Sequence, residues 1–240
     1  MTATKDIFQR SELLLGQTTL KMMAHKRVII FGIGGVGSWC AEALVRTGFY
    51  QVTIVDFDKV DATNINRQLM ATTETVGRPK VEVLRERLLT INPEAQITAI
   101  EEAFTADSAS KFCLEDYDYI IDAIDLLKDK AQLILRACET KAKLFSSMGA
   151  ALKCDASKIQ VAEFWKVKGD PLARALRNRF KKEKTFPRRK FLCVYSDEAV
   201  QNATMGKGSL VHITASFGMM LAGLVTEDVR SQMEKESCQK

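Results

Sequence analysis

A glycine-rich turn between an apolar segment and a helical segment is the feature that most constrains this chain. Arg27–Phe31 has the continuous apolar character of a buried strand, and residues 32–37 (GIGGVG) follow it at once. Ser38–Thr47 then has the composition of a helix. This order predicts a βα unit whose turn and helix N-terminus can hold a phosphate group.

Short β-branched segments alternate with helical segments over residues 1–150. This alternation predicts βαβ units with right-handed crossovers, and therefore a Rossmann-like α/β fold with a mainly parallel sheet flanked by helices. The expected strands are Arg27–Phe31, Val52–Asp56, Gln96–Glu101, Tyr119–Asp122 and Lys143–Ser147. The expected helices between them are Ser38–Thr47, Lys80–Thr90 and Lys128–Thr140.

The chain changes character after residue 150. Lys158–Phe164 alternates between apolar and polar residues, and Phe191–Tyr195 is expected to pair with it as an antiparallel extension of the sheet. Between them, Lys166–Lys190 carries eleven Lys and Arg against two carboxylates, a balance of +9 in a chain whose net charge is +5. Such density favours a surface for a nucleic-acid backbone over a solvated charged helix.

Composition predicts a soluble globular protein. With 46% hydrophobic residues, 27% charged residues and 4 Pro, the 240-residue chain is neither disordered nor fibrous. We expect a single adenylating domain over residues 1–240. Residues 1–150 would form its nucleotide-binding core, and residues 151–240 a basic substrate-side extension with a C-terminal helix.

Nothing at the start of the sequence resembles a secretory signal, so a cytoplasmic protein is expected. The apolar stretch Ser209–Val225 is shorter than the roughly 20 residues that span a bilayer, and it predicts a buried core helix and no membrane association. The six cysteines form no C-x-x-C pair and are expected to be reduced. Four of them lie in apolar segments and are expected to pack in the core: Cys40, Cys113, Cys138 and Cys193.

A carboxylate ends the second expected strand at a position suited to a nucleotide. Asp56 comes nineteen residues after Gly37, where a carboxylate can accept hydrogen bonds from ribose hydroxyls. A glycine turn that binds nothing is the alternative, and this context argues against it. An NAD-dependent dehydrogenase would share these features, but no acid or base for hydride transfer is recognisable.

Further polar residues favour a triphosphate over a dinucleotide. Residues 64–68 read Asn-Ile-Asn-Arg-Gln and residues 77–80 read Gly-Arg-Pro-Lys, which supplies the cations that a triphosphate needs. Asp122 and Asp125 lie at the carboxyl end of the fourth expected strand, at the sheet edge where ligands bind and where a carboxylate can hold Mg²⁺. For any one of these residues alone, a solvated loop charge or a helix cap is the alternative.

At these residues the chain resembles the ubiquitin-activating-enzyme-like adenylyltransferases. The shared motifs are G-x-G-G-x-G, D-x-D, N-x-N-R-Q, G-x-P-K and D-x-x-D, in that order, within residues 10–125. Inside that superfamily the chain is most similar to the tRNA threonylcarbamoyladenosine dehydratases. Residues 8–10 (FQR), 159–162 (IQVA), 170–173 (DPLA), 194–198 (VYSDE) and 214–218 (TASFG) carry this likeness over nearly the whole chain.

The resemblance implies an ATP-dependent cyclisation, by dehydration, of threonylcarbamoyladenosine next to the anticodon of tRNA. A carboxylate would be adenylated, and an internal attack would close a ring and release AMP after pyrophosphate. ATP and Mg²⁺ would be the cofactors, and tRNA bearing the modified nucleoside would be the substrate.

The family's roles carry over to particular positions of this sequence. Gly32, Gly34, Gly35 and Gly37 would line the phosphates, Asp56 would hold the ribose, and Asp122 would also belong to the nucleotide-binding residues. Asn64, Asn66, Arg67 and Lys80 would contact the triphosphate, and Asp125, with Asp58, would position Mg²⁺. Arg10 matches an arginine that reaches the γ-phosphate from the partner subunit, which implies a homodimer.

The main rival is an adenylyltransferase that activates the C-terminal glycine of a ubiquitin-like sulfur-carrier protein. Many such enzymes hold structural zinc with two C-x-x-C pairs, which this sequence lacks. A non-catalytic Rossmann-like binding module is a second alternative, against which Arg67, Lys80 and Asp125 argue. The resemblance also raises a sulfur-relay partner, although the loop between Glu198 and Gly208 carries no catalytic cysteine.

Overall fold

A seven-stranded sheet forms the centre of the described part of the chain, which comprises residues 7–199, 206 and 208–238 of a computed structural model. The strand order is β3-β2-β1-β4-β5-β7-β6, and all neighbours are parallel except β6 and β7, which are antiparallel. The expected Rossmann-like α/β fold with an antiparallel extension is confirmed. The strands are β1 Arg27–Phe31, β2 Gln51–Val55, β3 Gln96–Ile100, β4 Tyr119–Asp122, β5 Lys143–Ser147, β6 Ile159–Glu163 and β7 Leu192–Ser196.

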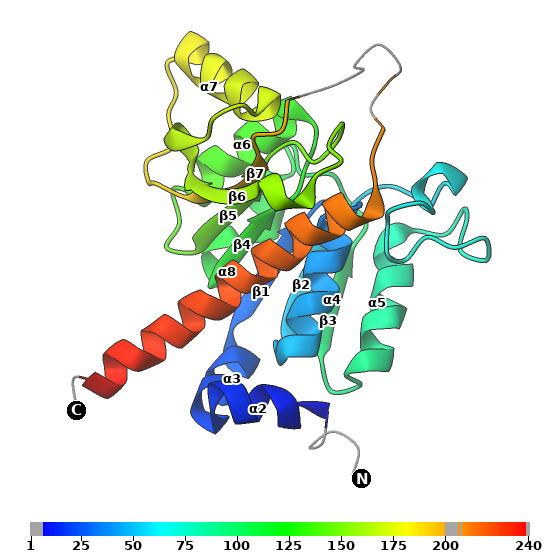
Figure 1. Cartoon of the computed structure of the whole chain (residues 1–240), viewed down its shortest axis with the longest axis vertical. Coiled ribbons are helices and arrows are strands. Elements are labelled where there is room, and N and C mark those ends of the chain that lie inside the picture. The colour runs from blue at the N-terminus through cyan, green and yellow to red at the C-terminus, as the bar shows by residue number, and fades with distance from the viewer. Residues whose placement is uncertain (1–6, 200–205, 207, 239–240) are drawn as a thin grey trace.

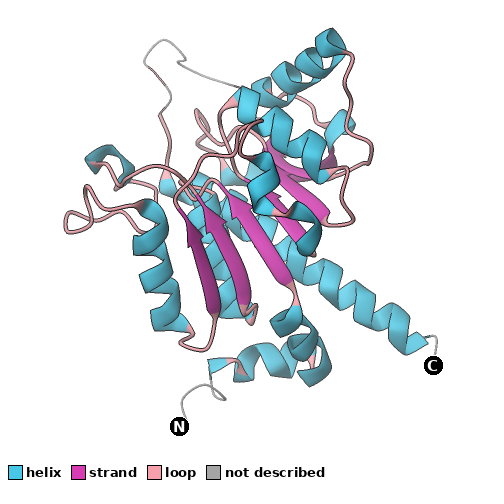
Figure 2. Ribbon diagram, turned by 180° about the vertical axis from the view of Figure 1, so that it is seen from behind, coloured by secondary structure: helices cyan, strands magenta, loops and turns pink. Residues whose placement is uncertain are grey.

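Helices cover both faces of the sheet (Figures 1 and 2). Alternate residues of β1 enter different cores: Val28 and Ile30 pack with α4, α5 and α8, whereas Ile29 and Phe31 pack with α6 and α7. The short helices α2 and α3 precede β1 and lie at its amino end, opposite the glycine turn. The helices are α2 Gln9–Leu15, α3 Gln17–His25, α4 Gly37–Thr47, α5 Lys80–Ile91, α6 Leu127–Ala137, α7 Pro171–Glu183 and α8 Val211–Cys238.

The expected elements between residues 27 and 196 are present, with ends shifted by at most three residues. The largest shift is at α6, which ends at Ala137 instead of Thr140. The Arg189 guanidinium donates hydrogen bonds to the carbonyl oxygens of Ala137 at 3.2 Å and Ala142 at 2.8 Å. These bonds satisfy carbonyl groups at the helix end, where the chain turns toward β5.

One expectation about the cysteines is wrong. Cys40, Cys138 and Cys193 are buried, but Cys113 is exposed. It lies between two short 3₁₀ turns with a φ of 44°, so the backbone turns sharply there. The neighbouring Phe112 and Leu114 side chains fill the core in its place.

The C-terminal apolar stretch forms the first half of the long helix α8. Its buried apolar residues recur every fourth position, which places them on one face of the helix: Ile213, Phe217, Leu221, Val225 and Val229. The stretch is thus a core helix, as expected, and it lies across α4 and the sheet (Figure 1). No helix among the described residues is both long enough and apolar enough to cross a membrane.

The contact between α8 and α4 depends on a glycine. A Cβ atom at Gly218 would lie 2.5 Å from the Val36 carbonyl oxygen and 2.9 Å from the Cys40 nitrogen, both backbone atoms. Only a residue without a side chain therefore lets the two helices approach this closely. Since α4 begins at the glycine turn, this contact also positions the turn.

A pair of glycine substitutions in α8 tests this packing. We expect Gly218→Ala to lower the free energy of unfolding by about 1–3 kcal/mol, because the added methyl group overlaps α4. Gly223→Ala is the matched control: it lies on the same helix with nothing within 4 Å of its Cβ position. It should raise stability by about 0.5–1 kcal/mol through helix propensity. Urea denaturation measures both, and equal effects would contradict the close approach.

Candidate functional site

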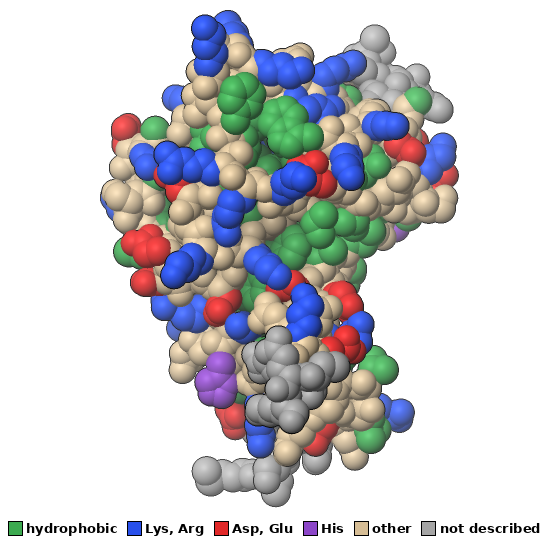
Figure 3. Space-filling model, turned by 90° about the vertical axis from the view of Figure 1, so that its left-hand side faces the viewer, with side chains coloured by type: hydrophobic (Ala, Val, Ile, Leu, Met, Phe, Trp, Pro, Cys, Tyr) green, Lys and Arg blue, Asp and Glu red, His purple; other side chains and the backbone are tan. Residues whose placement is uncertain are grey.

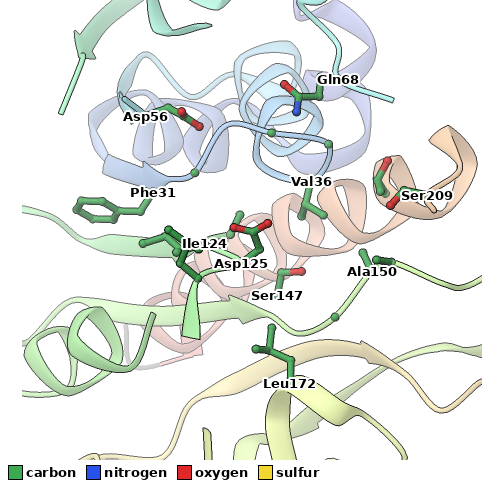
Figure 4. Close-up of a pocket in the computed structure, with 18 of the residues that line it drawn as sticks. Phe31, Val36, Asp56, Gln68, Ile124, Asp125, Ser147, Ala150, Leu172 and Ser209 are labelled. Atoms are coloured by element: carbon green, nitrogen blue, oxygen red, sulfur yellow. The ribbon is translucent and has the colours of Figure 1, made fainter. Parts of the chain in front are cut away.

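A cavity of about 1040 Å³ opens at the carboxyl ends of the parallel strands. One wall consists of the glycine turn and the segments after β2, and the opposite wall consists of the segments after β4 and β5 together with the start of α7. Figure 4 shows these walls facing each other, with Asp56 and Gln68 on one side and Ser147 and Leu172 on the other. Open α/β sheets bind ligands at this edge.

The glycine turn has almost no room for side chains. Gly32 has a φ of 79°, and a Cβ atom there would lie 2.8 Å from the carbonyl oxygen of Ala123. At Gly37 a Cβ atom would lie only 1.9 Å from the Gly32 carbonyl oxygen. These two glycines are required by the fold itself. At Gly34 the Cβ position is 3.6 Å from the Gln68 amide nitrogen, an ordinary contact, so the fold does not require a glycine there.

Asp56 follows β2 and holds the glycine turn in place through a hydrogen bond. Its two carboxylate oxygens accept hydrogen bonds from the backbone N–H groups of Ile33 and Asp58, each at 2.9 Å. Burial raises the pKa of the Asp56 carboxyl, against the opposing effects of Lys80 and these N–H groups. The carboxylate lines the cavity at the position expected for a ribose contact.

Lys80 and Asp58 form an ion pair at the edge of the cavity. Their Nζ and Oδ2 atoms are 2.7 Å apart, and the lysine side chain is almost fully buried while the aspartate is half exposed. Lys80 is the first residue of α5, and a backbone hydrogen bond of 3.0 Å from its N–H group to the Asp58 carbonyl oxygen fixes its position. The lysine cation is thus held at the cavity with little freedom.

The N-x-N-R-Q motif contributes residues with different roles. Arg67 lines the cavity, and its guanidinium donates to the Thr63 carbonyl oxygen at 2.8 Å. Asn64 also lines the cavity, while its side-chain oxygen accepts the Asp61 N–H at 3.2 Å. Asn66 does not line it; its amide donates to the Ser209 carbonyl oxygen at 2.9 Å and ties the motif to the segment before α8.

The two carboxylates of the D-x-x-D motif lie in different environments. Asp122 is fully buried and pairs with the fully buried Lys130 at 2.8 Å, and it also accepts a hydrogen bond of 2.6 Å from Ser146. Its side chain therefore lies behind the cavity wall rather than on it. Asp125 is exposed, lines the cavity, and forms no ion pair with the described residues. Figure 4 shows it between the glycine turn and Ser147.

The opposite wall contains two cations that the sequence did not place at the cavity, although one of them, Arg174, belongs to the basic segment that it singled out. Lys153 is buried and donates to the Ser196 carbonyl oxygen at 3.3 Å. Arg174 comes from the basic helix α7, whose first turn is capped by Asp170. Asp170 also accepts the Gly149 N–H at 3.0 Å and so joins α7 to the segment after β5. Burial raises the pKa of the Asp170 carboxyl.

Gln68 is a further cavity residue beyond the expected set. Its side chain is buried, and its oxygen has no hydrogen-bond partner among the described residues. A buried acceptor without a partner is costly, which indicates that a bound ligand or water supplies the missing donor. The N-x-N-R-Q motif was the signal that could have identified it.

Arg10 is the one expected site residue at the far end of the molecule. It is an exposed residue of α2, which lies at the amino end of β1 (Figure 1), whereas the cavity is at the carboxyl end. Arg10 is absent from the residues that line the cavity of its own chain.

The fold and the cavity define a protein of the ThiF family: residues 8–230 match that family, and the chain belongs to it. Within it, the chain is 34% identical over 245 residues to the tRNA threonylcarbamoyladenosine dehydratase of Bacillus subtilis, covering 95% of this chain and 96% of that one. The expected resemblance to these dehydratases is confirmed.

Solved structures agree with this relationship. The crystal structure of Escherichia coli tRNA N6-threonylcarbamoyladenosine dehydratase in complex with ATP matches with a TM-score of 0.91 at 35% sequence identity. The match covers 98% of both chains. The crystal structure of the same enzyme in complex with AMP matches equally well.

Two glycine variants separate the fold of the turn from its ability to hold phosphate. We expect Gly34→Ala to unfold like the native protein but to bind ATP about tenfold more weakly or worse, because a methyl group blocks close approach of a phosphate to the backbone. Gly37→Ala should instead lower the free energy of unfolding, because its methyl group collides with the Gly32 carbonyl oxygen. Thermal unfolding and calorimetric titration measure the two effects, and unchanged ATP affinity in Gly34→Ala would contradict the phosphate assignment.

Proposed function

We propose that this chain is an ATP-dependent adenylating enzyme that cyclises threonylcarbamoyladenosine in tRNA, with residues 1–240 acting as one domain. The observation that carries the proposal is the continuity of the cavity. It extends from the glycine turn, with Lys80 and Arg67, to Arg174 of the basic helix α7. A nucleotide site therefore opens directly onto a basic surface, as an enzyme with an RNA substrate requires. The near full-length similarity to dehydratases supports the same function.

ATP fits the cavity in one orientation. Asp56 accepts hydrogen bonds from the ribose, and the phosphates approach the backbone of the turn and the N-terminus of α4, where unpaired N–H groups favour an anion. Arg67 and Lys80 neutralise the phosphates that leave, and Asn64 and Gln68 add polar contacts. The related Escherichia coli enzyme was solved in complex with ATP and with AMP, which supports a nucleotide in this cavity. The residues proposed to line the phosphates are Gly32, Gly34, Gly35 and Gly37.

The proposed chemistry has two steps. The threonine carboxylate attacks the α-phosphorus of ATP, and pyrophosphate leaves with its bond electrons. The ureido carbonyl oxygen then attacks the activated carboxyl carbon, the ureido nitrogen loses a proton, and AMP departs with one of the former carboxylate oxygens. The cations of this chain stabilise the charge that develops on the leaving phosphates, where such stabilisation lowers the barrier most.

Magnesium is proposed at Asp125. No cluster of three or more His, Cys, Asp or Glu side chains suited to a metal occurs among the described residues. This agrees with Mg²⁺, which is usually held by one or two carboxylates together with substrate phosphates. The Asp125 carboxylate lines the cavity and forms no ion pair with any described residue, whereas Asp58 is already paired with Lys80. We therefore place Asp125 as the protein ligand, with Asp58 acting through Lys80.

A homodimer is proposed to complete the site. Arg10 lies too far from the cavity of its own chain to act there, so it would serve the cavity of a second copy. Its neighbours Leu13 and Leu14 are 78% and 83% exposed. Leucine side chains this exposed on one short helix are suited to burial against a partner.

We place the enzyme in the cytoplasm, where its proposed substrates ATP and tRNA meet. A sulfur-relay partner remains a prediction from the family resemblance. Among the described cysteines, Cys113 and Cys154 are exposed and are the thiols that such a partner can reach. The loop after Glu198, where a catalytic cysteine was sought in the sequence, lies largely outside the described residues.

Release of AMP and pyrophosphate tests the proposed function. We expect release from ATP and Mg²⁺ with tRNA that bears threonylcarbamoyladenosine, but not with unmodified tRNA, and the mass of that nucleoside should fall by one water. Lys80→Ala should slow release by about 100-fold or more, because one cation at the leaving phosphates is lost. Lys59→Ala, an exposed lysine outside the cavity, is the matched control. Release driven only by a carrier protein ending in Gly-Gly would overturn the proposal.

Mixing two inactive variants tests the role of Arg10. We expect Arg10→Ala and Lys80→Ala each to be inactive. After subunit exchange, a mixed dimer holds one cavity with its own Lys80 and the partner copy's intact arginine. Activity should return to about a quarter of the native value, since half of the dimers are mixed and each has one working cavity. No recovery on mixing, or full activity of Arg10→Ala alone, would contradict the shared site.

A further inference from the structure

Two aromatic side chains lie side by side on the surface next to the basic helix α7. Trp165 is 40% exposed and Phe186 is 50% exposed, and their ring centroids are 6.2 Å apart with an angle of 45° between the rings. Trp165 belongs to the 3₁₀ turn Phe164–Lys166 before α7, and Phe186 follows the end of α7. Exposed apolar side chains that lie next to one another are more often part of a binding site than single exposed ones are.

The pair rests on a rigid base. The rings of Phe164 and Trp165 meet edge to face, with their centroids 5.1 Å apart. Phe164 is fully buried and packs against Phe180 and Phe191. The Arg177 guanidinium donates to the carbonyl oxygens of Phe164 at 3.1 Å and Val167 at 2.9 Å, and so fastens the 3₁₀ turn to α7. The Trp165 side of the aromatic pair is therefore held in place before any ligand binds, which lowers the entropic cost of binding.

The surroundings of the pair are strongly positive. Three of the eleven cations in residues 166–190 have structural roles: Arg177 and Arg189 bind carbonyl oxygens, and Arg179 pairs with Glu183 at 2.8 Å. The other carboxylate of the segment, Asp170, is buried. Figure 3 shows hydrophobic side chains framed by Lys and Arg on this part of the surface. Eight cations are exposed and form no ion pair among the described residues: Lys166, Lys168, Arg174, Lys181, Lys182, Lys184, Arg188 and Lys190.

Flat aromatic rings framed by unpaired cations match the chemistry of single-stranded RNA. Unpaired bases stack on aromatic side chains, and cations hold the flanking phosphates. A base-paired duplex hides the faces of its bases, so it could use only the cations. We propose that Trp165 and Phe186 form a stacking platform for an unpaired base of the RNA substrate. This inference rests on the proposed function, whose target nucleoside lies beside the anticodon, in a loop of unpaired bases.

The helix α7 connects this platform to the cavity. Arg174, near the start of the helix, lines the cavity, while Phe186 follows its end. The thirteen residues of α7 span about 20 Å. The platform therefore holds a base other than the nucleoside that enters the cavity, and the exposed cations along α7 contact the phosphates between the two.

Binding of an anticodon stem-loop RNA tests the platform, with a fully paired duplex of the same base composition as the comparison. We expect Trp165→Ala and Phe186→Ala to weaken stem-loop binding by about 5-fold to about 150-fold and to leave duplex binding unchanged. Trp165→Phe keeps an aromatic ring and should bind nearly as the native protein does. Lys182→Ala should weaken both RNAs and reduce the slope of log affinity against log salt by about 1.

Native affinity for the stem-loop in both alanine variants would overturn the proposal, and so would equal losses of affinity for stem-loop and duplex. It would also be overturned if the alanine variants bound RNA normally but differed from the native protein in oligomeric mass. The last would identify the surface as a contact between copies of the chain. These measurements need no ATP, so they are independent of turnover. If the alanine variants lose stem-loop binding while the native enzyme fails to dehydrate tRNA, the platform stands and only the proposed function fails.

Discussion

The close contact between two backbone segments is the constraint on which the rest of the site depends. The glycine turn after β1 passes the segment after β4 so closely that Gly32 can carry no side chain beside the Ala123 carbonyl oxygen. On the other side of this contact, the buried Asp122–Lys130 ion pair holds the end of β4 and the start of α6 together. Breaking a buried pair of this kind leaves an uncompensated charge, at a typical cost of about 3–5 kcal/mol. The positions of the two cavity walls thus depend on contacts within the protein and do not require a bound ligand.

This arrangement leaves charge available where a nucleotide requires it. Lys80 is held by α5 and by Asp58, while the Asp125 carboxylate lines the cavity and has no ion-pair partner in the part of the chain that the structure describes. Arg174 of α7 lines the same cavity, and the aromatic pair Trp165 and Phe186, surrounded by cations, lies at the other end of α7. A single path therefore joins the proposed reaction centre to a surface with the chemistry of RNA binding. The excess of positive charge is concentrated in the same region, because residues 166–190 carry eleven Lys and Arg against two carboxylates.

Local sequence predicted the parts of this structure that depend on local physics. Apolar strands, the glycine turn and the carboxylates after the strands follow from short patterns, and they lie where those patterns indicate. The pattern D-x-x-D could not show which aspartate faces the cavity, because that depends on Lys130 reaching back to Asp122 from α6. Lys153 was missed for a similar reason, and Arg174 was expected in the basic segment but not at the cavity. Both reach the cavity only through the packing of distant segments. Arg10 was expected, from the resemblance alone, to reach the cavity of a partner subunit, and the fold places it far from the cavity of its own chain.

The claim that the cavity adenylates the threonylcarbamoyl carboxylate is tested most directly by following the two oxygen atoms of that carboxylate. If the cavity adenylates a carboxylate, tRNA whose threonylcarbamoyl carboxylate is labelled with heavy oxygen should yield AMP that carries one heavy oxygen. The other heavy oxygen should stay with the nucleoside, as the carbonyl oxygen attached to the ring. Mass spectrometry of the released nucleotide measures this in a single experiment. Label in inorganic phosphate, or AMP free of label while the ring still closes, would contradict the account, because the carboxylate would then not have been joined to the α-phosphate.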